Sequence, residues 1–278
     1  MVNLKRNQSE SRKQRMKTVR NHVQLTLDLV RRDVIGRYRG SALGVLWSLL
    51  TPLFMLAVYT FVFGTVFKAR WAGQGDDASI AEFAILLFSG LIVFQLFAEV
   101  ITKAPVLILS NAHFVKKVVF PLEILVPVAL GSALFHMAVS LLVLFAFLVP
   151  VHGSIPLTAL WLPVILAPFC LVVLGLAWFL ASLGTYLRDI SQVLGTIVTA
   201  LMFLSPIFFP LAALPEWIRP YIYFNPIALP IEQLRNALIF GISPEWFPLL
   251  VYTASSIVIV LLGYVFFQMM RKGFADVL

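Results

Sequence analysis

The sequence lacks the groups on which catalytic and ATP-hydrolysing proteins depend. It contains no Gly-x-x-x-x-Gly-Lys-Ser/Thr phosphate-binding loop, so the chain is not itself a P-loop ATPase. It has no His and Cys residues at metal-ligand spacing and no pair of carboxylates placed for acid–base catalysis. We therefore expect a protein that is not an enzyme, holds no cofactor or metal, and takes its energy from another chain.

Cysteine is nearly absent. Cys170 is the only one and lies within an apolar run, so an intrachain disulfide is impossible and a small core side chain is the simplest interpretation. The basic N-terminal part of the chain has no apolar stretch followed by small residues, which argues against a cleaved signal peptide.

Charged residues are scarce, and long apolar runs make up much of the chain. Only 12% of residues are charged while 60% are hydrophobic, and the mean hydropathy is +0.95, which is typical of an integral membrane protein. The net charge of +8 is concentrated at one end, since 11 of the 21 Lys and Arg residues precede Ser41. That distribution fits the cytosolic flank of a membrane protein and argues against a nucleic-acid partner.

The chain opens with a polar region. Residues 1–20 are basic and nearly without apolar residues, so we expect a disordered cytosolic tail. In residues 21–38 the apolar residues Val23, Leu27, Val30 and Val34 share one helical stripe, which predicts an amphipathic helix. It can lie in the headgroup layer with its arginines toward anionic membrane lipid, or pack on a protein partner.

Six apolar segments are long enough to cross a bilayer, and we expect an all-α integral membrane fold with six transmembrane helices. The spans cover about residues 42–67, 83–102, 124–149, 160–184, 193–209 and 246–270. This topology leaves 17 of the 21 Lys and Arg residues on the inner side, so both termini are expected in the cytoplasm. Two short re-entrant helices, over residues 214–224 and 231–240, are predicted to dip into the outer leaflet.

The predicted inner loops are basic. A short helix from Pro105 to Asn111 is followed by Lys116 and Lys117, and a tight turn carries Arg188 and Asp189. These charges fix the topology and are also placed to contact a cytosolic partner.

Aromatic residues recur at helical spacing. Tyr59, Phe63 and Phe67 form one ladder on the first span, and Phe203, Phe208 and Phe209 lie near the outer end of the fifth. Such rings serve in helix packing, or as a wall along which the apolar faces of sugars slide.

Ionisable groups within the spans are few. Glu99 and Glu123 lie close to helix ends, and only His136 is near mid-depth, where we interpret it as a hydrogen-bond partner between helices. Ion-coupled transport is therefore not favoured.

Several motifs agree in order and spacing with a known family. They are LVRRDVIGRYRGSALGVLWSLLTPLFMLAVYTFVFG, SNAHFVKKVVFPLEIL, YLRDISQ, FLSPIFFP and FNPIALPIEQLRNAL. From about residue 24 to the C-terminus the chain resembles the membrane subunits of ABC-2 type polysaccharide exporters. It is most similar to the O-antigen permeases, with the capsule and teichoic acid permeases as near relatives.

The resemblance implies a half-transporter in the bacterial inner membrane. Two copies would pair with two copies of a separate ATPase, which binds the ATP and Mg, to export a lipid-linked polysaccharide. The resemblance also implies roles for individual residues. ATPase coupling would involve Arg31, Arg32, Asp33, Arg37, Arg39, Pro105, Asn111, Lys116, Lys117, Arg188 and Asp189. The outer half-helices would gate the exit with Trp217, Tyr221, Phe224, Asn225, Pro226, Glu232 and Arg235.

Two other functions stay open. One is an ABC-2 exporter of a different glycan, a lipid or a drug. The other is a membrane-embedded transferase acting on lipid-linked sugars, for which Glu123 and His136 are the available catalytic residues.

Overall fold

A computed structural model describes residues 22–66, 80–115 and 120–278, and these residues form helices joined by turns, with no strand among them. The predicted tail of residues 1–20, Phe67, Lys116 and Lys117 lie outside the described residues.

Five helices in the described part of the chain are long and apolar enough to cross a membrane. They are Gly44–Val66, Ile80–Leu107, Leu122–His152, Leu157–Tyr186 and Trp246–Val277. The helix of residues 22–37 precedes the first of them, as the amphipathic pattern predicted. The principal helices are α2 (Trp47–Tyr59), α3 (Ile80–Leu107), α5 (Leu125–His152), α6 (Leu162–Tyr186), α7 (Ile190–Leu204) and α10 (Trp246–Met270).

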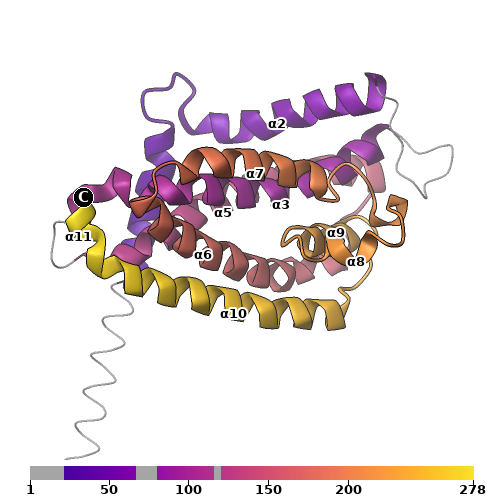
Figure 1. The fold of residues 1–278 in the computed structure, drawn as a ribbon. Coiled ribbons are helices and arrows are strands. Elements are labelled where there is room, and N and C mark those ends of the chain that lie inside the picture. Colours follow the sequence, from indigo (N-terminus) through magenta and orange to yellow (C-terminus); the bar gives the residue numbers. More distant parts are fainter. Residues whose placement is uncertain (1–21, 67–79, 116–119) are drawn as a thin grey trace, which may run out of the picture.

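Helix α3 is the centre of the bundle. Of its most apolar window 83% is buried, and α5, α6 and α7 pack around it (Figure 1). Its sequence is apolar on nearly every face because nearly every face meets another helix.

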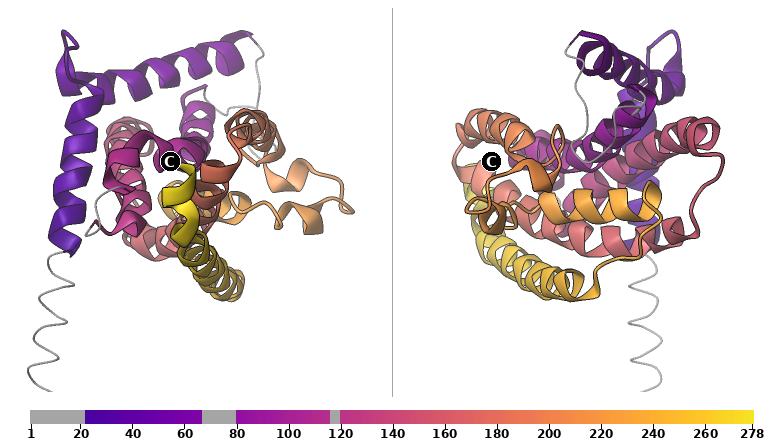
Figure 2. Two further views of the ribbon diagram at one scale, coloured as in Figure 1. Left: turned by 60° about the vertical axis from the view of Figure 1, so that its left-hand side comes forward. Right: turned by 90° about the vertical axis from the view of Figure 1, so that its right-hand side faces the viewer.

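Helix α2 lies at the edge of the bundle instead. Only 11% of its span is buried, and with the helix of residues 22–37 it forms a bent arm beside the other helices (Figure 2). The arm bends at residues 38–43, where Gly40 has a φ of 85° that favours glycine.

Helices α6 and α10 cross closely because glycines meet at the contact. A Cβ added to Gly263 would lie 2.0 Å from the carbonyl oxygen of Gly175. Close approach through small residues is a common means of packing helices in membranes, where lipid chains remove the hydrophobic driving force.

Helix α7 ends at Leu204, so the helix does not cover the whole of the predicted span over residues 193–209. Ser205 is extended, with a ψ of 151°, because it precedes Pro206 and cannot easily stay helical. The 15 residues of α7 reach about 22 Å, less than the roughly 30 Å core of a bilayer.

The two outer helices also differ from the prediction over residues 214–224 and 231–240. The first is a single turn, α8 (Arg219–Ile222), and the second is α9 (Ala228–Leu238). Helix α9 begins earlier than expected because the Asn225 carboxamide oxygen accepts a 3.0 Å hydrogen bond from the Ile227 amide, which turns the chain into the helix. Pro230 is tolerated because it lies in the first turn.

A separate helix beginning at Pro105 is not formed. Helix α3 continues through Pro105 to Leu107, and a 3₁₀ turn (Leu109–Asn111) and α4 (Ala112–Val115) follow. Pro105 has no N–H to donate to the Ile101 carbonyl, and the helix ends two residues after it, at Leu107. Its backbone also packs against Gly184, where a Cβ would come within 2.4 Å of the Pro105 Cα.

Candidate functional site

The helix of residues 22–37 is fastened to α3 by two ion pairs. Asp33 Oδ2 lies 2.7 Å from Lys103 Nζ, and Arg37 Nη1 lies 2.5 Å from Glu99 Oε1. On each helix the acid precedes the base by one turn. The first residue of one helix therefore pairs with the second residue of the other. This pattern fixes an antiparallel register, and we call the four residues the clamp.

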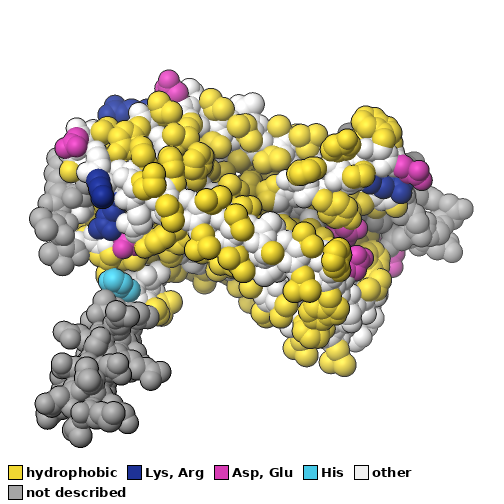
Figure 3. Space-filling model, turned by 60° about the horizontal axis from the view of Figure 1, so that its bottom comes forward, with side chains coloured by type: hydrophobic (Ala, Val, Ile, Leu, Met, Phe, Trp, Pro, Cys, Tyr) yellow, Lys and Arg dark blue, Asp and Glu magenta, His cyan; other side chains and the backbone are white. Residues whose placement is uncertain are grey.

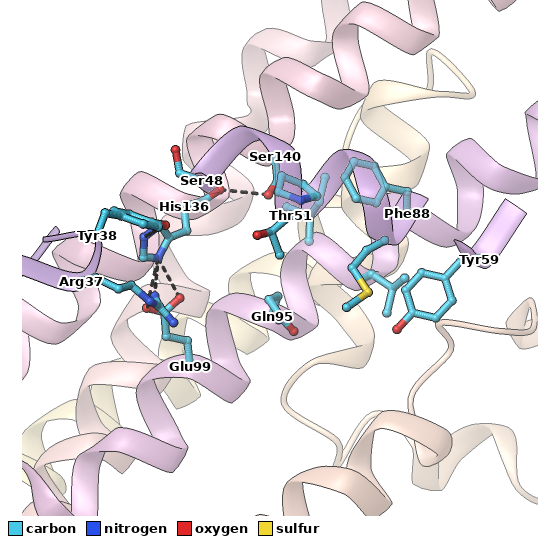
Figure 4. A pocket seen from close by; sticks show the side chains of 14 residues that line it. Arg37, Tyr38, Ser48, Thr51, Tyr59, Phe88, Gln95, Glu99, His136 and Ser140 are labelled. Atoms are coloured by element: carbon cyan, nitrogen blue, oxygen red, sulfur yellow. Dashed lines mark hydrogen bonds and ion pairs between the residues drawn. The ribbon is translucent and has the colours of Figure 1, made fainter. Parts of the chain in front are cut away.

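His136 on α5 extends the clamp to a third helix. Its Nδ1 lies 2.9 Å from Glu99 Oε2, and its Nε2 lies 3.2 Å from the Tyr38 hydroxyl (Figure 4). Nδ1 also lies 3.0 Å from Arg37 Nη1, so the imidazole contacts both members of the Arg37–Glu99 ion pair as well as the Tyr38 hydroxyl. The interpretation of His136 as a hydrogen-bond partner agrees with this geometry, but its partner Glu99 was missed.

Asp33 is poised to stay ionised in the clamp. Burial alone would raise the pKa of its carboxyl, but the hydrogen bond from Lys103, the nearby Ser132 hydroxyl and the charges of Lys103 and Arg37 together hold the pKa below its ordinary value. Asp33 therefore stays ionised across the neutral range.

The other residues predicted to couple the ATPase lie around the same end of the bundle. Arg31, Arg32 and Arg39 are exposed on the arm, and Arg188 and Asp189 are exposed in the turn between α6 and α7. Gly184, just before that turn, packs on the end of α3, which brings the two loops together. Figure 3 shows Lys and Arg side chains near this end of a mostly apolar flank, and we call it the basic end.

Asp33 and Arg37 differ from these residues. Although predicted to face a partner, both side chains point toward α3. Asn111 also turns inward, since its amide donates a 2.9 Å hydrogen bond to the Leu107 carbonyl at the end of α3.

Four of the predicted path aromatics form one continuous row. The ring of Phe63 lies 6.3 Å from Tyr59 and stacks at 5.3 Å on Phe208, which in turn stacks at 5.7 Å on Phe203. We call these four residues the aromatic ladder. Phe83 on α3 was not predicted but lies 6.4 Å from Phe63, and Phe209 is half-buried.

The ladder depends on a change in helix type. Residues Thr60–Val66 continue α2 as a π-helix, which shifts the direction of the following side chains relative to an α-helix. Phe63 lies within this segment and meets the extended chain after α7.

The predicted gate residues divide into two groups. Trp217, Tyr221 and Phe224 are exposed by 72%, 67% and 85%, and form an aromatic surface at the end opposite the clamp. Asn225 and Pro226 instead hold the fold. The Asn225 amide donates a 2.8 Å hydrogen bond to the Ser205 hydroxyl, and the Pro226 carbonyl accepts one of 2.7 Å from Tyr252.

Arg235 is buried rather than placed on a gate surface. It is 5% exposed and donates to the carbonyl oxygens of Leu86, Pro206 and Ile207 at 3.0, 2.5 and 2.8 Å. Burial lowers its pKa to about 9, so it remains charged at pH 7, and Glu232, one turn before it, is half-buried. The guanidinium thus joins the Leu86 carbonyl of α3 to the Pro206 and Ile207 carbonyls of the segment that follows α7.

Comparison with known proteins agrees with this architecture. Residues 24–239 match the ABC-2 type transporter family. The chain belongs to that family. It is therefore a membrane component of an ABC transporter, and the sequence-based identification as a transport subunit rather than an enzyme is confirmed.

The relatives of this ABC-2 permease are polysaccharide export proteins. The O-antigen export system permease protein RfbA of Klebsiella pneumoniae is 26% identical over 91% of this chain and 95% of its own length. RfbA of Myxococcus xanthus is 25% identical over 91% and 94%. The polysialic acid transport protein KpsM of Escherichia coli is 26% identical over 77% and 81%.

A charge-exchange series tests the clamp. Asp33→Lys places two ammonium groups together, so we expect it to lower the free energy of unfolding by about 1 kcal/mol, as a partly exposed pair allows. The double variant Asp33→Lys with Lys103→Asp restores the pair and should regain most of that loss. Thermal unfolding of the purified protein in detergent measures both. Arg31→Asp, at an exposed position of the same helix, is the control, and a double variant no better than Asp33→Lys would contradict the clamp.

A second prediction concerns Arg235. Arg235→Met leaves three carbonyl groups without their donor and should lower the free energy of unfolding by about 3 kcal/mol or more. Arg235→Lys keeps the charge but cannot reach all three oxygens, so it should recover only part of the loss. Arg219→Met is the control, since Arg219 bonds the Ala212 and Leu214 carbonyls at a half-exposed position. Equal thermal stability of the two Met variants would show that burial of Arg235 contributes nothing.

Proposed function

We propose that this ABC-2 permease is the membrane-spanning subunit of an ATP-driven exporter of lipid-linked polysaccharide of the O-antigen type. The observation that carries the proposal is the similarity to O-antigen permeases over 91% of the chain and 95% of the relative. The clamp and the aromatic ladder are the two structural features that suit it.

The clamp suits a subunit that is moved by another protein. The exposed arginines of the arm, Arg31, Arg32 and Arg39, contact the ATPase, while Asp33 and Arg37 on the opposite face hold α3. A displacement of the arm is passed to the most buried helix of the bundle, and from α3 to its neighbours. The basic loops with Lys116, Lys117, Arg188 and Asp189 add to the same contact surface.

The ladder suits a polymer substrate. Its flat rings offer dispersion contacts to the apolar faces of sugars without strong hydrogen bonds, so successive units bind weakly and move on. Phe203 is largely exposed, which leaves one end of the row open.

The resemblance to polysaccharide exporters implies the assembly that we propose. Two copies of the chain associate, with the sparsely buried α2 available for the contact, and each binds one ATPase that carries ATP and Mg. The domain of residues 21–278 lies in the bacterial inner membrane, with the tail of residues 1–20 and both termini in the cytoplasm. Helix α7 together with residues 205–210 makes a sixth crossing, and α8 and α9 dip into the outer leaflet, where Trp217, Tyr221 and Phe224 face the exit.

The similarity to the polysialic acid transport protein KpsM favours a second candidate, transport of polysialic acid or of another glycan. A membrane-embedded transferase has less support, since Glu123 is paired with Arg271 at 2.7 Å and His136 with Glu99.

Deletion of the gene tests the proposed function. We expect surface polysaccharide to disappear and lipid-linked glycan to accumulate inside, as measured with glycan-specific antibodies on intact and lysed cells. Complementation with Arg31→Glu, Arg32→Glu and Arg39→Glu together should lower export about tenfold, because three charges facing the ATPase are reversed. Asp276→Lys, an exposed reversal at the basic end but off the arm, is the control. Intact surface polysaccharide with new drug sensitivity in the deletion strain would instead indicate a drug exporter.

A further inference from the structure

Helices α2, α3 and α5 line a partly open cavity of about 250 Å³ that the proposed function does not yet use. Its walls are helical stripes, so side chains three or four residues apart face it from each helix. Figure 4 shows Thr51 of α2 and Gln95 of α3 in its middle, and Ser140 of α5 beside them.

The two ends of the cavity differ in chemistry. At one end lie Arg37, Glu99 and His136. These three residues and Gln95 also line a larger cleft of about 830 Å³ next to the arm, so the four side chains stand between the cleft and the cavity. At the other end lie Phe88 and Tyr59, and Tyr59 is the first ring of the aromatic ladder.

Gln95 and Thr51 supply polar groups that the fold leaves available. Gln95 is exposed on a helix whose neighbouring residues are nearly all buried. Neither side chain has a hydrogen-bond partner within residues 22–66, 80–115 and 120–278, whereas Thr60, Thr102 and Thr199 each donate to their own helix. Polar side chains at this depth of a membrane protein are costly without partners, and they mark substrate pathways more often than lipid contacts.

The chemistry of the lining selects the ligand. Arg37 is the one Lys or Arg among the residues lining this cavity, and it is held by Glu99, which disfavours a phosphate or other anion. The amide of Gln95 and the hydroxyl of Thr51 both donate and accept hydrogen bonds, as sugar hydroxyls require. The rings of Tyr59 and Phe88 offer flat apolar contact. At about 250 Å³ the space is just below the usual range for ligand pockets, roughly 300–1,000 Å³, so it holds one small ring rather than a chain.

We propose that this cavity binds a single neutral sugar unit of the transported glycan at the foot of the aromatic ladder, with Gln95 and Thr51 hydrogen-bonding its hydroxyls. The inference rests on the proposed function and adds to it a binding site within one protomer. It makes Gln95 and Thr51 determinants of which glycan is accepted.

Photo-crosslinking in cells tests the site directly. A photoreactive amino acid is placed at Gln95, at Thr51 or at Leu142, in the full chain expressed with its ATPase in the glycan-producing strain. Leu142 is the control because it is on α5 but 66% exposed. After irradiation, we expect glycan-specific antibodies to detect an adduct of the permease at positions 95 and 51 and none at position 142. Adducts at none of the three, or at all three equally, would overturn the proposal.

Substitutions give a second readout. Gln95→Leu and Thr51→Val each remove hydrogen bonds at nearly constant volume, so we expect export to slow by roughly threefold to tenfold at unchanged protein amount. Thr199→Val, on α7 and away from the cavity, should export normally. Normal export by both cavity variants would contradict the site.

These results are distinguishable from failure of the proposed function. If the deletion strain keeps its surface glycan, the chain does not export that glycan, and the proposed function fails first. If the deletion strain loses its glycan but residues 51 and 95 capture none of it, only the sugar site is wrong.

Discussion

The clamp is the interaction on which the rest of the arrangement depends. In the helix of residues 22–37, Val34 is the one buried residue, so apolar packing alone holds this helix weakly. The paired charges supply both the attraction and the register, because Asp33 can meet Lys103 while Arg37 meets Glu99 only in one antiparallel alignment. Near the low-dielectric interior such pairs are stronger than in water, and an unpaired Glu99 would be costly.

Hydrophobicity alone predicted where most spans lie, because a span needs an apolar run as long as the bilayer is thick, whatever its packing partners. Helix ends were less predictable. The run over residues 193–209 stays apolar to its end, but the backbone breaks at Ser205 because Pro206 follows. At Pro105 the predicted helix boundary was wrong in the other direction. Proline is common at the start of a helix, but Pro105 lies in the last turn of α3, where Gly184, 79 positions later, leaves room for it.

Contacts of the candidate site were predictable where both residues lie close together in the sequence. Four-residue spacing placed Tyr59 and Phe63 on one stripe of the first span, and the rings are indeed neighbours. Their connection to Phe208 depends on the π-helix Thr60–Val66 and the break after α7, neither of which leaves a periodic signal. Likewise, the partnership of Glu99 with His136 depends on how α3 and α5 align. The burial of Arg235 depends on carbonyl groups of α3 and of the segment after α7, which the tertiary fold brings together.

Arg37 links the two proposals physically. It belongs to the clamp, through Glu99, and to the wall that separates the cleft from the cavity. Movement of the arm by the ATPase cannot leave this wall unchanged, because the same guanidinium would have to move with the helix. A ligand in the cavity that favours one position of Arg37 must then favour the corresponding position of the arm by the same free energy. Sugar binding and ATPase docking would thus be coupled through a single ion pair, without any longer pathway between them.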